Sequence, residues 1–156
     1  MCMEFTDLYN SILSRLGQGS NVESLQCDNE GRCSLTVHGH QQIFIHPHTP
    51  LQSLYFSVTL PGDLPSVISL EFVGSVLEMA FDSIDGQGCA LSRGPDRLLR
   101  LSMGVPLTLF AEQEPLDILA VFLKAVEHFS VLLDTEFRLA KTQEPNGVPP
   151  VHALKA

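Results

Sequence analysis

Apolar side chains recur with a helical spacing in three segments of the chain. In residues 3–17 they form one stripe, and Gly17 stands at the usual C-terminal position of a helix. A second helix is predicted over residues 66–81, with Ser66 as its N-cap. The third begins at Pro115, a favourable first helical residue, and continues to about Lys141.

Between these helices, apolar and polar residues alternate as they do in strands with one buried face. The middle strand of the first group is expected to break at Gly39, and the hairpin after the second helix should turn at Gly94, Pro95 and Asp96. The predicted strands lie near 23–27, 33–46 and 53–60, in a hairpin over 89–103, and over 106–110. The expected fold is therefore α+β: helix, three strands, helix, two or three strands and a long helix, with a twisted antiparallel sheet.

The length of 156 residues is that of one ordinary domain, which we expect over residues 1–141. Residues 142–156 contain three prolines and one glycine without apolar periodicity and are predicted to form a flexible tail. No apolar run is long enough to span a bilayer, and the N-terminus lacks the features of a signal peptide, so we expect a cytoplasmic protein with no membrane insertion.

The chain is strongly acidic, with eighteen Asp and Glu against nine Lys and Arg and a formal charge of -9. This charge repels nucleic acid and anionic membrane surfaces. Partners are therefore expected to be basic, neutral or apolar.

Two histidine pairs suggest an alternative function. His38 and His40, and likewise His46 and His48, are separated by one residue, so each pair would share a face on a strand. However, no further ligand completes a standard metal-binding spacing, and Gly39 and Pro47 favour turns. A small metal- or ligand-binding α+β protein that uses these histidines and the nearby cysteines stays as the alternative, but we predict no metal and no cofactor.

The cysteines and the known catalytic motifs give little support for an enzyme. No nucleophile elbow, phosphate loop or zinc-protease motif is present, and Cys89 would be a nucleophile only with a histidine close in space. Cys27 and Cys33 flank a turn and can lie near each other across a hairpin, but a structural disulfide is not expected in a reducing cytosol. We therefore predict a non-enzymatic protein.

The second helix has too little polar surface to leave one side in water, because residues 67–81 contain only two charges, Glu71 and Glu78. The sheet can cover one side only. The other side is covered either by the long third helix or by a second copy of the chain across a twofold axis. The apolar stripe comprises Val67, Leu70, Val73, Val76, Leu77, Ala80 and Phe81, whereas Ile68, Phe72 and Met79 fall outside its centre.

Taken together, the chain resembles the class I chaperones of bacterial type III secretion systems, of the Tir chaperone type. The resemblance covers residues 3–141 in element order, size and acidity. It rests on the opening "FTDLYNSILSRLG", on the Leu-Pro loop before "VISLEFVGSVLEMAF", and on "CALSRGPDRLLRLSMGVPL" before the acidic start of the last helix. The chain departs from the family pattern in its longer "HGHQQIFIHPHTP" segment and in its extended tail.

The resemblance implies a bacterial cytoplasmic homodimer that keeps the N-terminal segment of one or more secreted effectors extended, soluble and competent for export. It also implies that the export ATPase of the apparatus performs the release. In this family the second helix and an adjacent strand form the dimer interface. Carried onto this sequence, the interface residues are Leu70, Val73, Val76, Leu77, Leu99 and Leu101.

An extended client segment can be held by backbone hydrogen bonds to a sheet edge and by apolar pockets for alternate side chains. Helix one and the first strands supply the candidate pocket residues, each of which can equally belong to the core. These effector-binding candidates are Phe5, Leu8, Ile12, Ile43, Phe44, Ile45 and Phe56.

Overall fold

The structure, a computed structural model, describes residues 4–62, 64–65, 68–81 and 88–143. Within these residues the chain forms three α-helices, six strands and two short 3₁₀ helices. In chain order the elements are α1 (Phe5–Gly17), β1 (Val22–Cys27), β2 (Cys33–Val37), β3 (Ile43–His48), η1 (Thr49–Leu51), β4 (Ser53–Leu60), α2 (Leu70–Phe81), β5 (Cys89–Arg93), β6 (Leu99–Pro106), η3 (Leu107–Ala111) and α3 (Pro115–Gln143).

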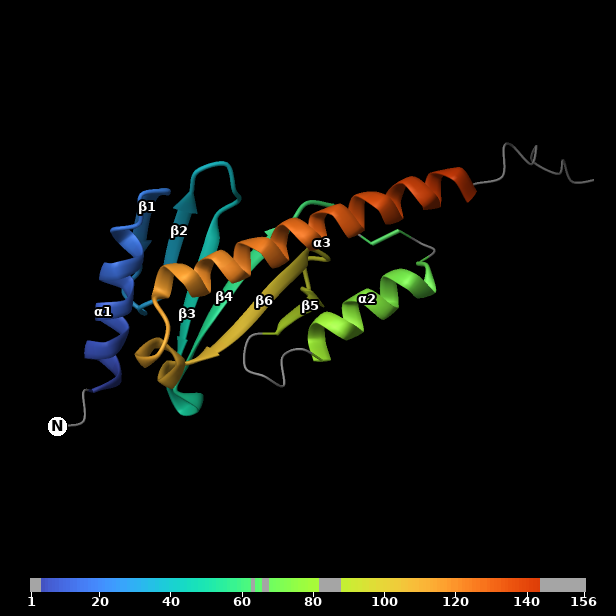
Figure 1. The fold of residues 1–156 in the computed structure, drawn as a ribbon. Helices are drawn as coiled ribbons and strands as arrows, with labels where there is room; N and C mark the ends of the chain where they lie inside the picture. Colours follow the sequence, from blue (N-terminus) through green and yellow to red (C-terminus); the bar gives the residue numbers. More distant parts are fainter. Residues whose placement is uncertain (1–3, 63, 66–67, 82–87, 144–156) are drawn as a thin grey trace, which may run out of the picture.

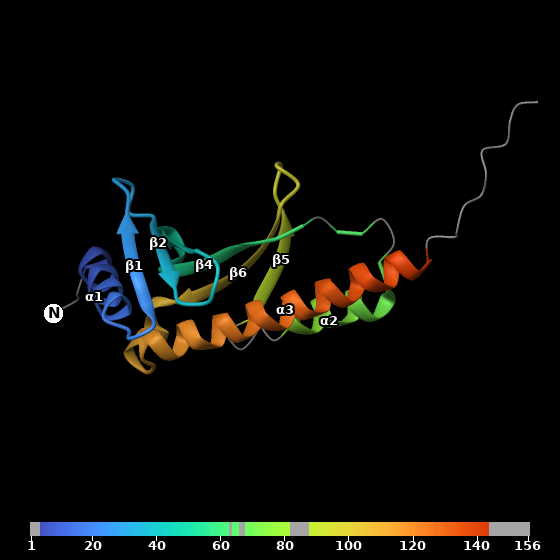
Figure 2. The ribbon, with the colours of Figure 1, turned by 90° about the horizontal axis from the view of Figure 1, so that it is seen from above.

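The six strands form one antiparallel sheet in the order β1-β2-β3-β4-β6-β5, so β1 and β5 are its two edges. Helices α1 and α3 lie on the same face of this sheet (Figures 1 and 2). Helix α2 packs beside β5, at the end of the sheet remote from α1. The predicted α+β fold is confirmed.

Strand alternation separates an apolar face from a polar one. In β4 the inward residues Leu54, Phe56, Val58 and Leu60 are buried under α3, where Phe56 and Phe122 bring their ring centroids to 5.9 Å. The opposite, open face of the sheet carries mainly small polar side chains, such as the paired Ser57 and Ser102. The sheet therefore needs helices on one face only.

The structure confirms one strand prediction and corrects another. The strand expected over 33–46 is broken at Gly39 as predicted, giving β2 and β3, and Gly39 adopts a positive φ of 75° in the turn between them. Residues 106–110 do not form a separate strand, since β6 continues to Pro106 and η3 follows. Leu107 and Phe110 are both buried, and their separation of three residues matches the repeat of a 3₁₀ helix.

The helix boundaries also differ from those predicted. Helix α2 begins at Leu70, and Ser69 supplies the cap through its Oγ, which accepts a hydrogen bond from the Phe72 N–H at 3.1 Å. The predicted cap, Ser66, lies outside the described residues. Helix α3 includes Thr142 and Gln143, the first two residues of the predicted tail, and the rest of that tail also lies outside the described residues.

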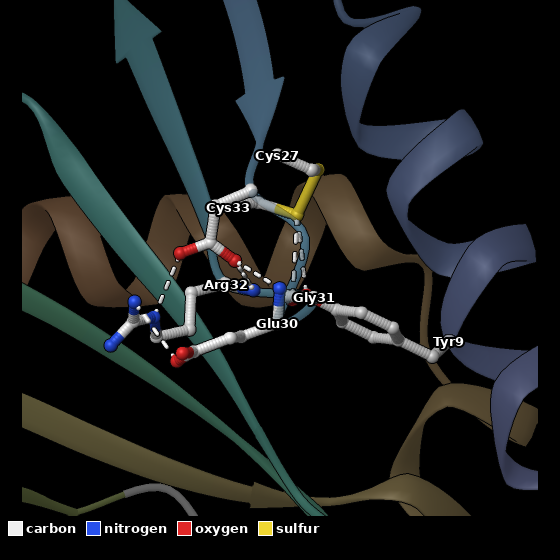
Figure 3. The surroundings of a disulfide bond; sticks show 7 residues. Tyr9, Cys27, Glu30, Gly31, Arg32 and Cys33 are labelled. Atoms are coloured by element: carbon white, nitrogen blue, oxygen red, sulfur yellow. Dashed lines mark hydrogen bonds and ion pairs between the residues drawn. A yellow bond between two sulfur atoms is a disulfide. The ribbon is translucent and has the colours of Figure 1, made fainter.

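A disulfide joins Cys27 and Cys33, which corrects the expectation that these cysteines are not bridged. The two residues are direct partners in the β1–β2 register, with Cα atoms 4.0 Å apart at the turn (Figure 3). This hairpin geometry brings the sulfurs together. In the described part of the chain, no helix is long and apolar enough to cross a membrane.

Candidate functional site

The outward side of α2 is an apolar surface open to solvent. Leu70 is 89% exposed, Leu77 63% and Val73 41%. These three residues, at intervals of three and four, form one face of the helix, which we call the α2 face. Neither the sheet nor α3 covers it.

The side of α2 that packs against the core is not centred on the apolar stripe that the sequence predicts. Phe72 is buried against the core, and Val76 and Met79 are partly buried beside it. The sequence placed Phe72 and Met79 outside the centre of the apolar stripe, but they pack against the core, whereas the stripe residues of the α2 face are exposed to water. The helix is apolar on both sides, so periodicity alone could not select the inner one.

A hollow of about 310 Å³ lies between α2 and the β5–β6 hairpin. Its walls are mainly aliphatic and aromatic, and Leu99 contributes to them although it is almost fully buried. Leu101 is completely buried in the core. Of the six predicted interface residues, the four on α2 thus reach or approach the surface and the two on β6 do not. The lining residues are Leu64, Ile68, Phe72, Val73, Val76, Leu77, Leu91, Ser92, Arg93 and Leu99.

The predicted effector-binding residues do not form one site. Ile12, Ile43, Ile45 and Phe56 belong to the core and expose almost no surface. Phe5 and Leu8 are partly buried on α1. Phe44 is half-exposed on the opposite face of the sheet, because it alternates with Ile43 and Ile45 along β3.

A second hollow, of about 250 Å³, lies where the loop before β1, the start of this edge strand, the end of β2 and the start of α3 meet. Val22, Val37, Leu119 and Leu123 give it an apolar floor, and Leu116 at its rim is 41% exposed. We call it the β1 hollow. The sequence prediction missed it, because its residues come from distant segments and no local pattern marks β1 as an edge.

The comparison with known families identifies the chain. The family model of the Tir chaperone protein (CesT) family matches residues 11–130. This chain belongs to the Tir chaperone family. The resemblance found in the sequence is therefore confirmed.

Two solved structures share the fold of this Tir chaperone family member. One is the Yersinia pestis type III secretion chaperone SycH in complex with a stable fragment of YscM2, at 14% identity and a TM-score of 0.61, covering 80% of this chain and 98% of that one. The other is the HopA1-SchA chaperone-effector complex, at 12% identity and a TM-score of 0.56, covering 83% and 98%. None of the curated proteins matches the chain in sequence.

Within the described part of this family member, the two predicted histidine pairs do not form one cluster. His38 Nδ1 lies 2.8 Å from Glu23 Oε1, and His40 Nε2 lies 3.8 Å from Glu127 Oε1. His46 and His48 share the open face of the sheet, within β3 rather than in the turn expected at Pro47. Burial, followed by the charge of Arg32, lowers the pKa of His46. Among the described residues, no group of three or more His, Cys, Asp or Glu could hold a metal ion.

The Cys89 thiol lies in the core. Burial raises its pKa to about 11, so it stays protonated at neutral pH. A buried neutral thiol is a packing residue rather than a nucleophile.

Proposed function

We propose that this chain is a homodimeric chaperone of a bacterial type III secretion system. In the bacterial cytoplasm it binds the N-terminal segment of a secreted effector and keeps that segment extended, soluble and competent for export. The observation that carries the proposal is the match of the Tir chaperone family model over residues 11–130. The SycH and SchA structures each contain a chaperone with a bound partner, which is consistent with this role.

The exposed α2 face supports the proposed homodimer. Leu70, Val73 and Leu77 present aliphatic side chains that no other described element covers. In a twofold contact each residue contributes buried area from both protomers, so a short helix can supply a large part of an interface. Val76 and Leu99 line the adjoining hollow, and Leu101 would support the interface from the core below.

The β1 hollow supports a site for the client. An extended segment could add to the free edge of β1 by backbone hydrogen bonds and insert an apolar side chain beside Leu116. Phe5 and Leu8, on the helix next to β1, would extend the apolar contact. The charge of -9 favours clients with Lys or Arg between their apolar anchors.

The proposed role needs no catalysis and no cofactor in this chain. Holding an extended segment is a binding equilibrium, and the energy for release would come from the export ATPase. The chaperone therefore needs only to form a stable dimer and to have a client-binding site from which the export apparatus can extract the bound segment.

The direct test is light scattering of the full chain alone and after coexpression with candidate effectors encoded nearby. A mass near twice 17.1 kDa that increases by one client segment per dimer is expected. A monomer that retains no coexpressed effector would contradict the proposal. Deletion of the N-terminal segment of the effector should abolish the complex, whereas deletion of its C-terminal domain should not.

A further inference from the structure

The Cys27–Cys33 bridge is built asymmetrically. Cys27, at the end of β1, is exposed, whereas Cys33, at the start of β2, is only 2% exposed. Cys27 is therefore the residue of the pair that is open to a reagent from solution, whereas Cys33 Sγ lies in a buried contact with Tyr9. Access is one of the factors that set the rate of thiol–disulfide exchange at a given sulfur.

The turn between the two cysteines is held closed without the covalent bond. Asp28 Oδ1 accepts hydrogen bonds from the backbone N–H groups of Glu30 and Arg32, both at 2.9 Å, and Asp28 Oδ2 accepts one from Arg32 Nε at 2.8 Å. The Asp28 N–H also donates to the Arg32 carbonyl at 2.8 Å. Cleavage of the bridge would thus leave the sulfurs near each other and able to rejoin.

The buried sulfur has a hydrogen-bond donor beside it. The Tyr9 hydroxyl of α1 lies 3.3 Å from Cys33 Sγ and donates to the Gly31 carbonyl at 2.6 Å. Burial first, and then the charge of Asp28, raises the pKa of Tyr9 to about 12, so the hydroxyl keeps its proton. Rotation of the O–H about the C–O bond can direct this proton to Cys33 Sγ instead, where it would stabilise a thiolate.

An open hollow of about 470 Å³ adjoins the bridge. Both cysteines line it, together with polar and aromatic side chains that can contact a small peptide-like molecule. The other lining residues are Gln26, Asp28, Arg32, Ser34, Phe44 and His46.

From this arrangement we propose that the Cys27–Cys33 pair is a site of reversible thiol–disulfide exchange with a low-molecular-weight thiol. The thiolate of that molecule attacks Cys27 Sγ, a new S–S bond forms to Cys27, and the Cys27–Cys33 bond breaks. The electron pair of the broken bond leaves on Cys33 Sγ, which then takes a proton from water. A second small thiolate then attacks the sulfur of the small molecule bound to Cys27. An S–S bond forms between the two small molecules, and Cys27 leaves as a thiolate. The protein gains two electrons as two small thiols become one disulfide, and the reverse steps oxidise the pair.

The test uses the full chain with Cys2→Ser and Cys89→Ser, so that only the pair remains, and glutathione as the small thiol. The bridged protein is incubated with reduced glutathione under native conditions, quenched with acid and mapped by mass spectrometry. We expect one glutathione on Cys27, and a reduction rate that rises with glutathione concentration while the circular dichroism stays native. A glutathione adduct on Cys33, or reduction only at the rate of global unfolding, would overturn the proposal.

Two single-cysteine variants in this background provide the matched control. With oxidised glutathione, the Cys33→Ser chain, which retains Cys27, should be modified at least about tenfold faster than the Cys27→Ser chain, which retains Cys33. Tyr9→Phe should slow cleavage of the bridge by about tenfold, because the variant loses one hydrogen bond to the thiolate that forms on Cys33. Equal modification of the two single-cysteine chains would refute the asymmetry on which the proposal depends.

Discussion

The Glu136 carboxylate near the end of α3 holds the first turn of α2 through Ser69. Its two oxygens accept hydrogen bonds from the Ser69 N–H at 2.5 Å and from the Ser69 hydroxyl at 2.8 Å, and that hydroxyl oxygen accepts one from the Phe72 N–H. Glu136 is the one charged residue that is buried among the described residues. The negative charge also lies at the positive end of the α2 dipole. The long helix therefore sets where α2, and with it the α2 face, is placed.

Removal of this carboxylate should destabilise the protein and loosen α2. In Glu136→Ala two donors on Ser69 lose their acceptor inside the protein, which is expected to lower the free energy of unfolding by about 2 kcal/mol. Glu136→Gln retains one acceptor and should cost about half as much. Urea unfolding measures both, and Glu127→Ala, an exposed carboxylate on the same helix, should change stability by less than about 0.5 kcal/mol. Equal values for Glu136→Ala and Glu127→Ala would show that Glu136 does not hold α2.

A charge on the α2 face should break the proposed dimer without unfolding the chain. Leu77 is a sharper target than Val76, because Leu77 faces solvent whereas Val76 packs partly against the core. Leu77→Asp would bury two like charges near a twofold axis and raise the dimer dissociation constant by about a hundredfold, or about 3 kcal/mol. Light scattering over a dilution series measures this change.

The control for the α2 face is Leu51→Asp. Leu51 in η1 is 61% exposed, close to the value for Leu77, but lies in another part of the chain. This variant should remain dimeric. If Leu77→Asp also remains dimeric while retaining its native circular dichroism, the assigned interface is wrong.

The local part of the fold could be predicted because it is encoded by neighbouring residues. The start of α3 at Pro115 and the turn of the β5–β6 hairpin at Gly94 follow from backbone preferences of single residues, and both are found. The break at Gly39 was likewise visible, although it produces one more strand than expected.

The candidate sites were less predictable because they depend on which elements meet. Phe72 and Leu77 are both large apolar residues of one helix, and only the position of β5 and Glu136 determines that Phe72 points inward. In the same way, Leu116 becomes part of a hollow only because α3 begins beside β1. Burial is a tertiary property, which the type of residue alone does not determine.

A charge at the rim of the β1 hollow should weaken client binding but leave the dimer intact. Leu116→Asp places a carboxylate where an apolar client side chain is proposed to insert, and should reduce affinity by about tenfold. Titration of the purified dimer with a labelled N-terminal effector peptide measures the affinity. Val131→Asp, at a more exposed position of α3 outside this hollow, is the matched control and should bind as the wild type does. An equal loss in both variants would indicate a general charge effect instead of a local site.

Alkaline pH should selectively weaken the contact between α1 and the β1–β2 turn through Tyr9. The pKa of Tyr9 is raised from 10.0 to about 12 in the folded chain, chiefly by burial, so folding favours the protonated phenol. The stability that this group contributes is therefore fully present below pH 10 and is lost as the pH rises from 10 toward 12. Urea unfolding of the bridged chain across this window should show a steeper fall for the wild type than for Tyr9→Phe, which has no proton to lose. Parallel curves for the two proteins would mean that the Tyr9 hydroxyl ionises equally in the folded and unfolded states, and that its hydrogen bond to Gly31 does not secure the turn.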